Sequence, residues 1–226
     1  WSFKGLFGKF DRGSLQRGYQ VYTEVCASCH SMKYLSYRNL AEKGGPEFSI
    51  EQVKAIAASF EVTDGPNSDG EMFERPAKLS DKFVKPYENV KAAQAANGGA
   101  YPPDMSVLAK ARSGGVDYIY SVLLGYEDPP SGVTLDDGVY YNKYMYGNNI
   151  KMAQPLSDGL IEYTDGTIAS EEQMAKDVST FLMWAAEPHL EARHKMGFKA
   201  ILYLIILTIL VYFSMKKIWS RIESKV

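Results

Sequence analysis

Apolar residues recur at helical spacing in several segments of the chain. The first of these segments begins at Ser14, which is a suitable N-cap, and its apolar face is formed by Leu15, Tyr19, Tyr22 and Val25. A second helix is expected over residues 50–60 with Ser49 as its cap, and shorter helices over residues 106–112 and 116–126. These segments predict a mostly helical domain.

A further helix is expected after Ser170. Ser170 and Gln173 have the spacing of a capping box, in which each residue's side chain bonds the other's backbone. Pro188 ends this helix. Its buried face is expected to consist of Met174, Val178, Phe181 and Ala185.

Two long stretches show no helical or strand period. Residues 61–106 contain five prolines and several glycines, and residues 127–165 are irregular and rich in tyrosine. Residues 1–13 also resemble an irregular arm. Unstructured loops of this length are uncommon in a compact domain unless they serve a function or wrap around a core that is not protein.

One apolar run near the C-terminus differs from the amphipathic segments. Residues 200–215 contain no charge, and the run extended back to Met196 contains only Lys199. Twenty helical residues span roughly 30 Å, the thickness of a bilayer core. A buried helix of a soluble protein is the alternative, but polar residues frame the run sharply on both sides. We therefore expect a transmembrane helix over 194–217.

These patterns divide the chain into a head, a span and a tail. We expect the extramembrane head to cover residues 1–193, with a charged neck from about 187, and a basic tail to cover residues 218–226. The net charge of −2 over 226 residues excludes a generally basic nucleic-acid binder. The opening WSFKGLFGKF lacks the charged and apolar regions of a signal peptide, which predicts either a cytoplasmic head or a processed mature form.

The chain contains only two cysteines, Cys26 and Cys29, and His30 follows the second. A structural zinc site needs four ligands, and the other histidines, His189 and His194, lie in the neck. A thioredoxin-like dithiol lies at a strand-to-helix turn, whereas a helix is expected before this motif, and neither a dithiol nor a disulfide explains the histidine.

The spacing C-x-x-C-H is the signature of covalent haem c attachment. Two thiols at this spacing can form thioether bonds to the two vinyl groups of one haem, and His30 can then bind the iron. Haem c is attached outside the cytoplasm, so the head is expected in the periplasm or the mitochondrial intermembrane space, after removal of a signal peptide. The inner side then holds the basic residues Lys216, Lys217, Arg221 and Lys225, in agreement with the positive-inside rule.

No histidine remains in the head for the opposite face of the haem, so the second axial ligand is expected to be a methionine. Position along the chain leaves Met72, Met105, Met145 and Met152 as candidates. Met145 and Met152 lie in a loop far downstream of His30, where the chain can return across the other face. The pattern favours Met152, with Pro155 beyond it, and leaves Met145 open.

The chain resembles the cytochrome c1 family over nearly its whole length. The resemblance is carried by RGYQVYTEVCASCHSMKYLSYRNL, DGPNSDGEMFERPAKLSD, AANGGAYPPDMS, ARSGGVDYIYSVLLGY and AKDVSTFLMWAAEP, together with the single C-terminal span. It implies a c-type cytochrome head whose long loops wrap around one haem, with Met152 as the axial methionine. It also implies that Asn97 and Arg112 lie at the haem propionates. Further haem-pocket residues implied by the resemblance are Pro102, Pro103 and Tyr118.

The resemblance also implies a function as the electron-transfer subunit of the cytochrome bc1 complex, a quinol–cytochrome-c reductase. The haem would accept an electron from the Rieske iron–sulfur protein and pass it to cytochrome c, while cytochrome b oxidises quinol in a dimeric, proton-translocating complex. The alternatives are another membrane-anchored monohaem cytochrome, such as an oxidase or nitric-oxide-reductase subunit, and, more remotely, a ligand-binding haem sensor or peroxidase.

Two surface features complete the expectations. Some bacterial relatives carry an inserted, disulfide-bearing loop before the axial methionine, which this chain lacks. We expect this loop to be held by packing of Tyr140, Tyr141, Tyr144 and Tyr146. An acidic run is expected to steer a basic cytochrome c to the haem edge; it consists of Glu61, Asp64, Asp69, Glu71 and Glu74.

Overall fold

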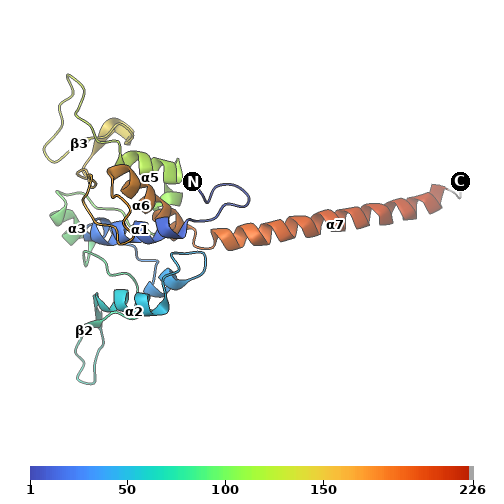
Figure 1. Cartoon of the computed structure of the whole chain (residues 1–226), viewed down its shortest axis with the longest axis horizontal. Coiled ribbons are helices and arrows are strands. Elements are labelled where there is room, and N and C mark those ends of the chain that lie inside the picture. The colour runs from blue at the N-terminus through green and yellow to red at the C-terminus, as the bar shows by residue number, and fades with distance from the viewer. Residues whose placement is uncertain (224–226) are drawn as a thin grey trace.

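The computed structural model of the chain describes residues 1–223 and consists of a mostly helical head from which one long helix projects (Figure 1). This confirms the predicted fold class. The α-helices are α1 (Arg12–Glu24), α2 (Ile50–Ala58), α3 (Val90–Ala96), α4 (Leu108–Ala111), α5 (Gly115–Leu123), α6 (Glu171–Ala186) and α7 (Leu190–Glu223). The 3-10 helices are η1 (Cys26–Ser28), η2 (Tyr37–Ala41) and η3 (Tyr146–Asn148). The strands are β1 (Glu61–Asp64), β2 (Phe73–Pro76), β3 (Tyr140–Tyr141) and β4 (Asn149–Ile150).

Helix α1 begins earlier than expected. Its N-cap is Asp11, whose side chain accepts a hydrogen bond from the backbone N–H of Ser14 (2.7 Å). Ser14 is therefore inside the helix, and its hydroxyl donates to the buried carboxylate of Asp177 on α6 (2.6 Å). The prediction of Ser14 as the cap was wrong because a tertiary contact, which local sequence does not reveal, uses that hydroxyl.

Helices α1 and α6 form the scaffold of the head, and α4 and α5 pack on α6. The predicted face of α6, with Met174, Val178, Phe181 and Ala185, is buried as expected. Ser170 is its N-cap, but the capping box is incomplete. The amide of Gln173 donates instead to Asp177 (2.9 Å), which also binds Arg17 of α1 (2.8 Å).

Ser49 caps α2 as expected, and it also forms a capping box that was not predicted, since Ser49 and Gln52 bond each other's backbone. The irregular stretch 61–106, in contrast, contains regular structure that was not expected. Strands β1 and β2 pair in an antiparallel hairpin, and α3 follows. Both strands are largely exposed, so they lack the alternation of apolar and polar residues that identifies a half-buried strand. Helix α3 buries only Ala93, which gives it no apolar face to detect.

The tyrosine-rich stretch is not held as expected. Tyr140, Tyr144 and Tyr146 are exposed, Tyr146 almost completely at 98%. The fully buried side chain of Asn142 instead fixes the turn between β3 and β4: it donates to the carbonyl oxygen of Val122 on α5 (2.8 Å). It also accepts from the backbone N–H groups of residues 144 and 145. Packing of the tyrosines was therefore the wrong explanation for most of them.

Helix α7 is long and apolar enough to cross a membrane, and it is the one such helix among residues 1–223. It begins at Leu190, so most of the expected neck is helical and continuous with the apolar run. Its first turn is tied to the head, because Glu191 accepts from the backbone N–H of Phe10 (3.0 Å) and from Arg12 (3.0 Å). The end of the predicted basic tail, including Lys225, lies outside the described residues.

Candidate functional site

The C-x-x-C-H motif follows directly from α1. Helix α1 ends at Glu24 and the chain tightens into η1, in which the backbone N–H groups of Cys29 (3.1 Å) and His30 (2.9 Å) both bond the carbonyl oxygen of Cys26. This turn holds the two thiols and the imidazole on one short segment. Both thiols are partly buried and are not joined to each other. Burial, with a smaller contribution from Cys29, raises the pKa of the Cys26 thiol to about 12.

The His30 ring is held in one tautomer. Its Nδ1 lies 2.9 Å from the carbonyl oxygen of Pro103, which can only accept, so Nδ1 carries the proton and the Nε2 lone pair is left free. Burial lowers the pKa of His30 although the bond to Pro103 opposes this, and the ring is therefore neutral. A neutral imidazole oriented by a backbone carbonyl is the usual form of a metal-binding histidine.

The segment 103–106 runs alongside the motif and fixes it. The N–H of Met105 donates to the carbonyl oxygen of Ser31 (2.8 Å). The Oδ2 atom of Asp104 accepts from the Ser31 hydroxyl (2.8 Å) and from the N–H of Lys33 (3.0 Å), while its Oδ1 accepts from the N–H of Ser106 (3.0 Å). Burial of Asp104 disfavours its charge, but these hydrogen bonds outweigh that effect and lower its pKa.

Asp104→Asn is expected to lower the free energy of unfolding by about 1–3 kcal/mol at neutral pH, because the amide group cannot accept all three hydrogen bonds. Since the folded-state pKa of Asp104 lies below the ordinary value of 3.8, its carboxylate stabilises the head above that pH and loses this effect as the pH falls through the folded pKa. The difference between variant and wild type should shrink in acid. Denaturant unfolding at neutral pH and at acidic pH measures this difference in the free energy of unfolding. A difference that does not change with pH would contradict this role of Asp104.

A second set of contacts joins Cys29 to the loop that precedes Met152. The hydroxyl of Tyr87 lies 4.0 Å from the sulfur of Cys29 and accepts from the amide of Asn97 (3.1 Å). The next residue, Gly98, accepts from the ammonium of Lys151 through its carbonyl oxygen (3.2 Å). The loops that carry Cys29, Asn97 and Met152 are therefore neighbours.

Of the four candidate methionines, Met145 and Met152 lie in the downstream loop and are held differently. The hydroxyl of Tyr118, on α5, donates to the sulfur of Met145 (3.2 Å), so this sulfur already has a partner. Met152 is held through its backbone, because the hydroxyl of Tyr126 donates to its carbonyl oxygen (3.0 Å). Burial raises the pKa of Tyr126, so its hydroxyl stays protonated as a donor. The side chain of Met152 is thus free of the contact that engages Met145.

Contacts do not bring every expected residue to the motif. Pro103 contacts His30, whereas Arg112 is exposed and its guanidinium donates to the carbonyl oxygen of its neighbour Ala111 (3.2 Å). Pro102 has no hydrogen-bonding contact with the motif among residues 1–223. Sequence reasoning missed Asp104, Tyr87 and Tyr126. Asp104 follows a proline pair, which was a local signal for a fixed turn, but its partners Ser31 and Lys33 at the motif lie about 70 residues away.

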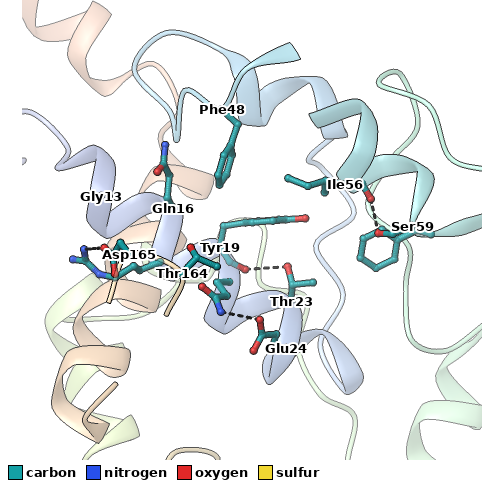
Figure 2. A pocket seen from close by; sticks show the side chains of 13 residues that line it. Gly13, Gln16, Tyr19, Thr23, Glu24, Phe48, Ile56, Ser59, Thr164 and Asp165 are labelled. Atoms are coloured by element: carbon teal, nitrogen blue, oxygen red, sulfur yellow. Dashed lines mark hydrogen bonds and ion pairs between the residues drawn. The ribbon is translucent and has the colours of Figure 1, made fainter. Parts of the chain in front are cut away.

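A separate hollow of about 350 Å³ lies on the outer side of α1, between α2 and residues 164–165 (Figure 2). Tyr19 and Phe48 form part of its wall, and none of the expected site residues lines it. Its polar groups bond within the wall: Gln20 donates to Glu24 (2.9 Å), and Arg17 binds Asp165 (2.8 Å). This hollow offers no group for the chemistry of the C-x-x-C-H motif.

The donor set of the motif fits haem c. Two adjacent free thiols and one neutral, oriented imidazole are the groups that attach and ligate it. Within residues 1–223, no three histidine, cysteine, aspartate or glutamate side chains gather closely enough to hold a metal ion by themselves.

Residues 1–222 match the protein family described as the Cytochrome C1 family. The chain is 52% identical over 97% of its length to "Cytochrome b/c1" of Bradyrhizobium diazoefficiens, of which it spans 35%. It is 49% identical over its whole length to "Cytochrome c1-2, heme protein, mitochondrial" of Solanum tuberosum and spans 85% of that protein. It is 48% identical, again over its whole length, to "Cytochrome b-c1 complex catalytic subunit, mitochondrial" of Candida albicans, of which it spans 77%. With this match over nearly every residue and a motif suited to haem, the chain belongs to the cytochrome c1 family.

Proposed function

We propose that this chain is the haem-bearing electron-transfer subunit of a cytochrome bc1 complex. Cys26 and Cys29 would attach haem c covalently, and His30 and Met152 would bind the iron from opposite faces. The observation that carries this proposal is the His30 ring, whose Nδ1–H is committed to Pro103 while Nε2 is left free beside two unjoined thiols. Membership of the cytochrome c1 family supports haem as the cofactor. A relative named as a subunit of the cytochrome b-c1 complex supports this complex as the assembly.

The bound haem c would supply one-electron redox chemistry, accepting an electron from the Rieske iron–sulfur protein and giving it to cytochrome c. The chain's own residues orient the axial groups and exclude water. His30 is only 9% exposed, Tyr22 donates to its carbonyl oxygen (3.3 Å), and Asp104 accepts from the backbone N–H of Lys33 just beyond it (3.0 Å). With both axial positions taken by protein, no substrate would bind at the iron.

The remaining expected residues would complete the haem pocket. Asn97 lies next to Cys29 through Tyr87, and its position supports a contact with one propionate. Arg112 is exposed, its guanidinium donates to a backbone carbonyl oxygen, and it forms no ion pair with a carboxylate within residues 1–223, so this cation would be available to the other propionate. Pro102, Pro103 and Tyr118 would line the pocket.

The chain would act within a larger assembly. We propose that α7 spans the bilayer, with the head in the periplasm or the intermembrane space and the basic C-terminal end on the cytoplasmic or matrix side. Cytochrome b and the Rieske protein would be partners in a dimeric complex, in which this chain contributes to quinol–cytochrome-c reductase activity without binding quinol.

Gentle detergent purification tests the whole proposal. The chain is expected to copurify with a dihaem cytochrome b and an iron–sulfur protein, and its haem is expected to stay bound to the polypeptide on a denaturing gel. An extractable haem would contradict covalent attachment. Copurification with an oxidase or nitric-oxide reductase instead would assign the chain to another complex.

The acidic run lies on the β1–β2 hairpin, which projects from the head (Figure 1). Asp64 is ion-paired with Arg75, which also binds Asp81 (2.6 Å), so the single cation of the run is neutralised. Four exposed acids remain on or near the hairpin, which also exposes the apolar side chains of Met72 and Phe73; these acids are Glu61, Asp69, Glu71 and Glu74. A surface that combines exposed apolar side chains with exposed acids would suit transient docking of a basic cytochrome c.

Replacing Asp69, Glu71 and Glu74 with their amides is expected to slow reduction of a basic cytochrome c several-fold at low ionic strength. Long-range attraction raises association rates, and screening limits its reach to about 10 Å at 0.1 M salt, so the variant and wild-type rates should converge as salt is added. Stopped-flow kinetics on the purified complex measures this. The matched control changes three exposed acids on another loop, Asp128, Asp136 and Asp137. Equal slowing by the control would show an effect of net charge rather than a docking site.

A further inference from the structure

The N-terminal arm is a closed loop with a fixed shape. The backbone N–H of Lys9 donates to the carbonyl oxygen of Ser2 (3.0 Å), which closes the loop over residues 2–9. Gly8 allows this closure, because a Cβ there would lie only 2.3 Å from the carbonyl oxygen of Phe3. Gly5, at φ +85°, takes a conformation that favours glycine at the opposite end. We call residues 2–9 the N-terminal loop.

The base of the N-terminal loop is anchored in the head. Phe3 and Phe10 are buried and their rings are 5.0 Å apart, and Trp1 stacks on Phe3 (5.7 Å). The indole N–H of Trp1 and the ammonium of Lys4 both bind the carboxylate of Asp117 on α5. The loop is therefore tied to the core and is not a free terminus.

The tip of the loop, in contrast, exposes apolar side chains. Leu6 is 56% exposed and Phe7 is 73% exposed, although the aromatic residues a few positions away are buried. Leu6 and Phe7 give this anchored loop an exposed apolar tip, and such a tip marks a site of protein or membrane contact where it is part of a larger apolar patch.

This apolar tip lies beside the start of the membrane helix. The ring of Phe7 contacts that of Phe198 on α7 (5.8 Å), and Figure 1 shows the arm on the side of the head from which α7 leaves. Phe198 immediately precedes Lys199 and the charge-free run 200–215. The tip is thus at the level where the apolar surface of α7 begins, and the two surfaces are continuous.

Charge at this level complements a lipid surface. Lys9 and Lys199 are exposed, one at the base of the loop and one on α7. Phenylalanine and leucine side chains of interfacial segments bury at the boundary of headgroups and acyl chains, and lysines near that boundary attract anionic headgroups.

We propose that the tip of the N-terminal loop, Leu6 and Phe7, inserts into the headgroup region of the bilayer as a second membrane contact beside α7. The loop would fix the tilt and rotation of the head on the membrane surface, because Trp1, Phe10 and Arg12 transmit its position to the core. A lipid partner is favoured over a protein one because the tip continues the lipid-facing surface of α7 and is flanked by lysines. This inference rests on the proposed membrane-spanning role of α7.

Photolabelling by lipid tests the proposal on the full haem-loaded chain. The chain is reconstituted in vesicles of phosphatidylcholine and phosphatidylglycerol that contain a phospholipid with a diazirine near its headgroup, and labelled peptides are mapped by mass spectrometry. Residues 5–9 are expected to be labelled to an extent similar to residues 196–203. The control is Ile168, an apolar residue on the head that is 85% exposed and therefore reports labelling through exposure alone. Leu6→Ser with Phe7→Ser should reduce labelling of the loop several-fold and leave labelling of α7 unchanged.

The possible outcomes distinguish membrane contact of the N-terminal loop from membrane contact of α7. Labelling of residues 196–203 reports whether the start of α7 lies at the bilayer surface, independently of the loop. If α7 is labelled and the loop is labelled no more than Ile168, the inference is wrong while the membrane anchor stands. If the loop is labelled in the isolated chain but protected in the purified complex, a partner protein covers the tip and the lipid contact is likewise rejected. Labelling of the loop in both preparations supports the proposal.

Discussion

Replacing Met152 with leucine is expected to leave the haem covalently attached but to lower its reduction potential by roughly 100–300 mV, part of the range of about 0.8 V over which axial ligands set haem potentials. A thioether sulfur favours ferrous iron, and leucine offers no donor in its place. The reduced variant should therefore also bind carbon monoxide, which the wild-type protein should not. Redox titration and the spectrum under carbon monoxide measure the two effects.

Met145→Leu is the matched control, because it also removes a thioether sulfur, from another methionine of the same loop. The sulfur of Met145 accepts a hydrogen bond from Tyr118, so its loss should weaken the packing of the loop on α5 and shift the potential only slightly. If Met145→Leu lowers the potential and opens the iron to carbon monoxide while Met152→Leu does neither, Met145 is the axial ligand. The hydrogen bond to Tyr118 would then have to break when the haem is bound.

Local sequence was sufficient where a feature depends on residues close together in the chain. Ser49 and Gln52 cap α2 through a spacing of three residues, and the buried face of α6 follows from its helical period. The C-x-x-C-H motif is equally local, since its spacing alone places two thiols and an imidazole on one turn.

Local sequence was insufficient where a polar side chain is used by a distant partner. Ser14 has a side chain typical of an N-cap, but its hydroxyl donates to Asp177, and Asp11 caps α1 instead. Asn142 resembles any loop asparagine, yet it is fully buried and bonds α5. Asp104 fixes the motif from about 70 residues away. Such contacts exist only after the chain has folded, so no local pattern encodes them.

The motif therefore depends on a scaffold that the motif itself does not include. Helix α1 runs into Cys26, and its position is set by α6 through the buried carboxylate of Asp177, which binds Ser14 and Arg17. Tyr22 of α1 continues this support, because its hydroxyl donates to the carbonyl oxygen of His30 (3.3 Å). A change at the contact of α1 with α6 should consequently affect the site.

Gly18→Ala is expected to destabilise the head strongly, because at Gly18 the backbone of α1 packs directly against α6. A Cβ there would lie 2.1 Å from the backbone oxygen of Asp177 and 2.7 Å from the Cβ of Phe181, and neither atom can move without displacing α6. Overpacking of this kind costs up to about 3 kcal/mol, and the better helix propensity of alanine returns only about 1 kcal/mol. The net loss of about 2 kcal/mol corresponds to a fall in Tm of roughly 4–8 °C for a domain of this size.

Gly13→Ala, on the same helix, is the control that separates close packing from helix propensity. Its Cβ would meet the flexible guanidinium of Arg17 at 3.3 Å and the carboxylate of Asp11 at 3.4 Å, both of which can shift slightly. Its Tm should stay within a few degrees of wild type or rise, since alanine is the better helix former. Thermal unfolding followed by circular dichroism in detergent compares the two variants. Because α1 leads into the motif, Gly18→Ala should also admit carbon monoxide to the reduced haem more readily, and equal Tm values for both alanine variants would show that the contact of α1 with α6 is looser than its geometry indicates.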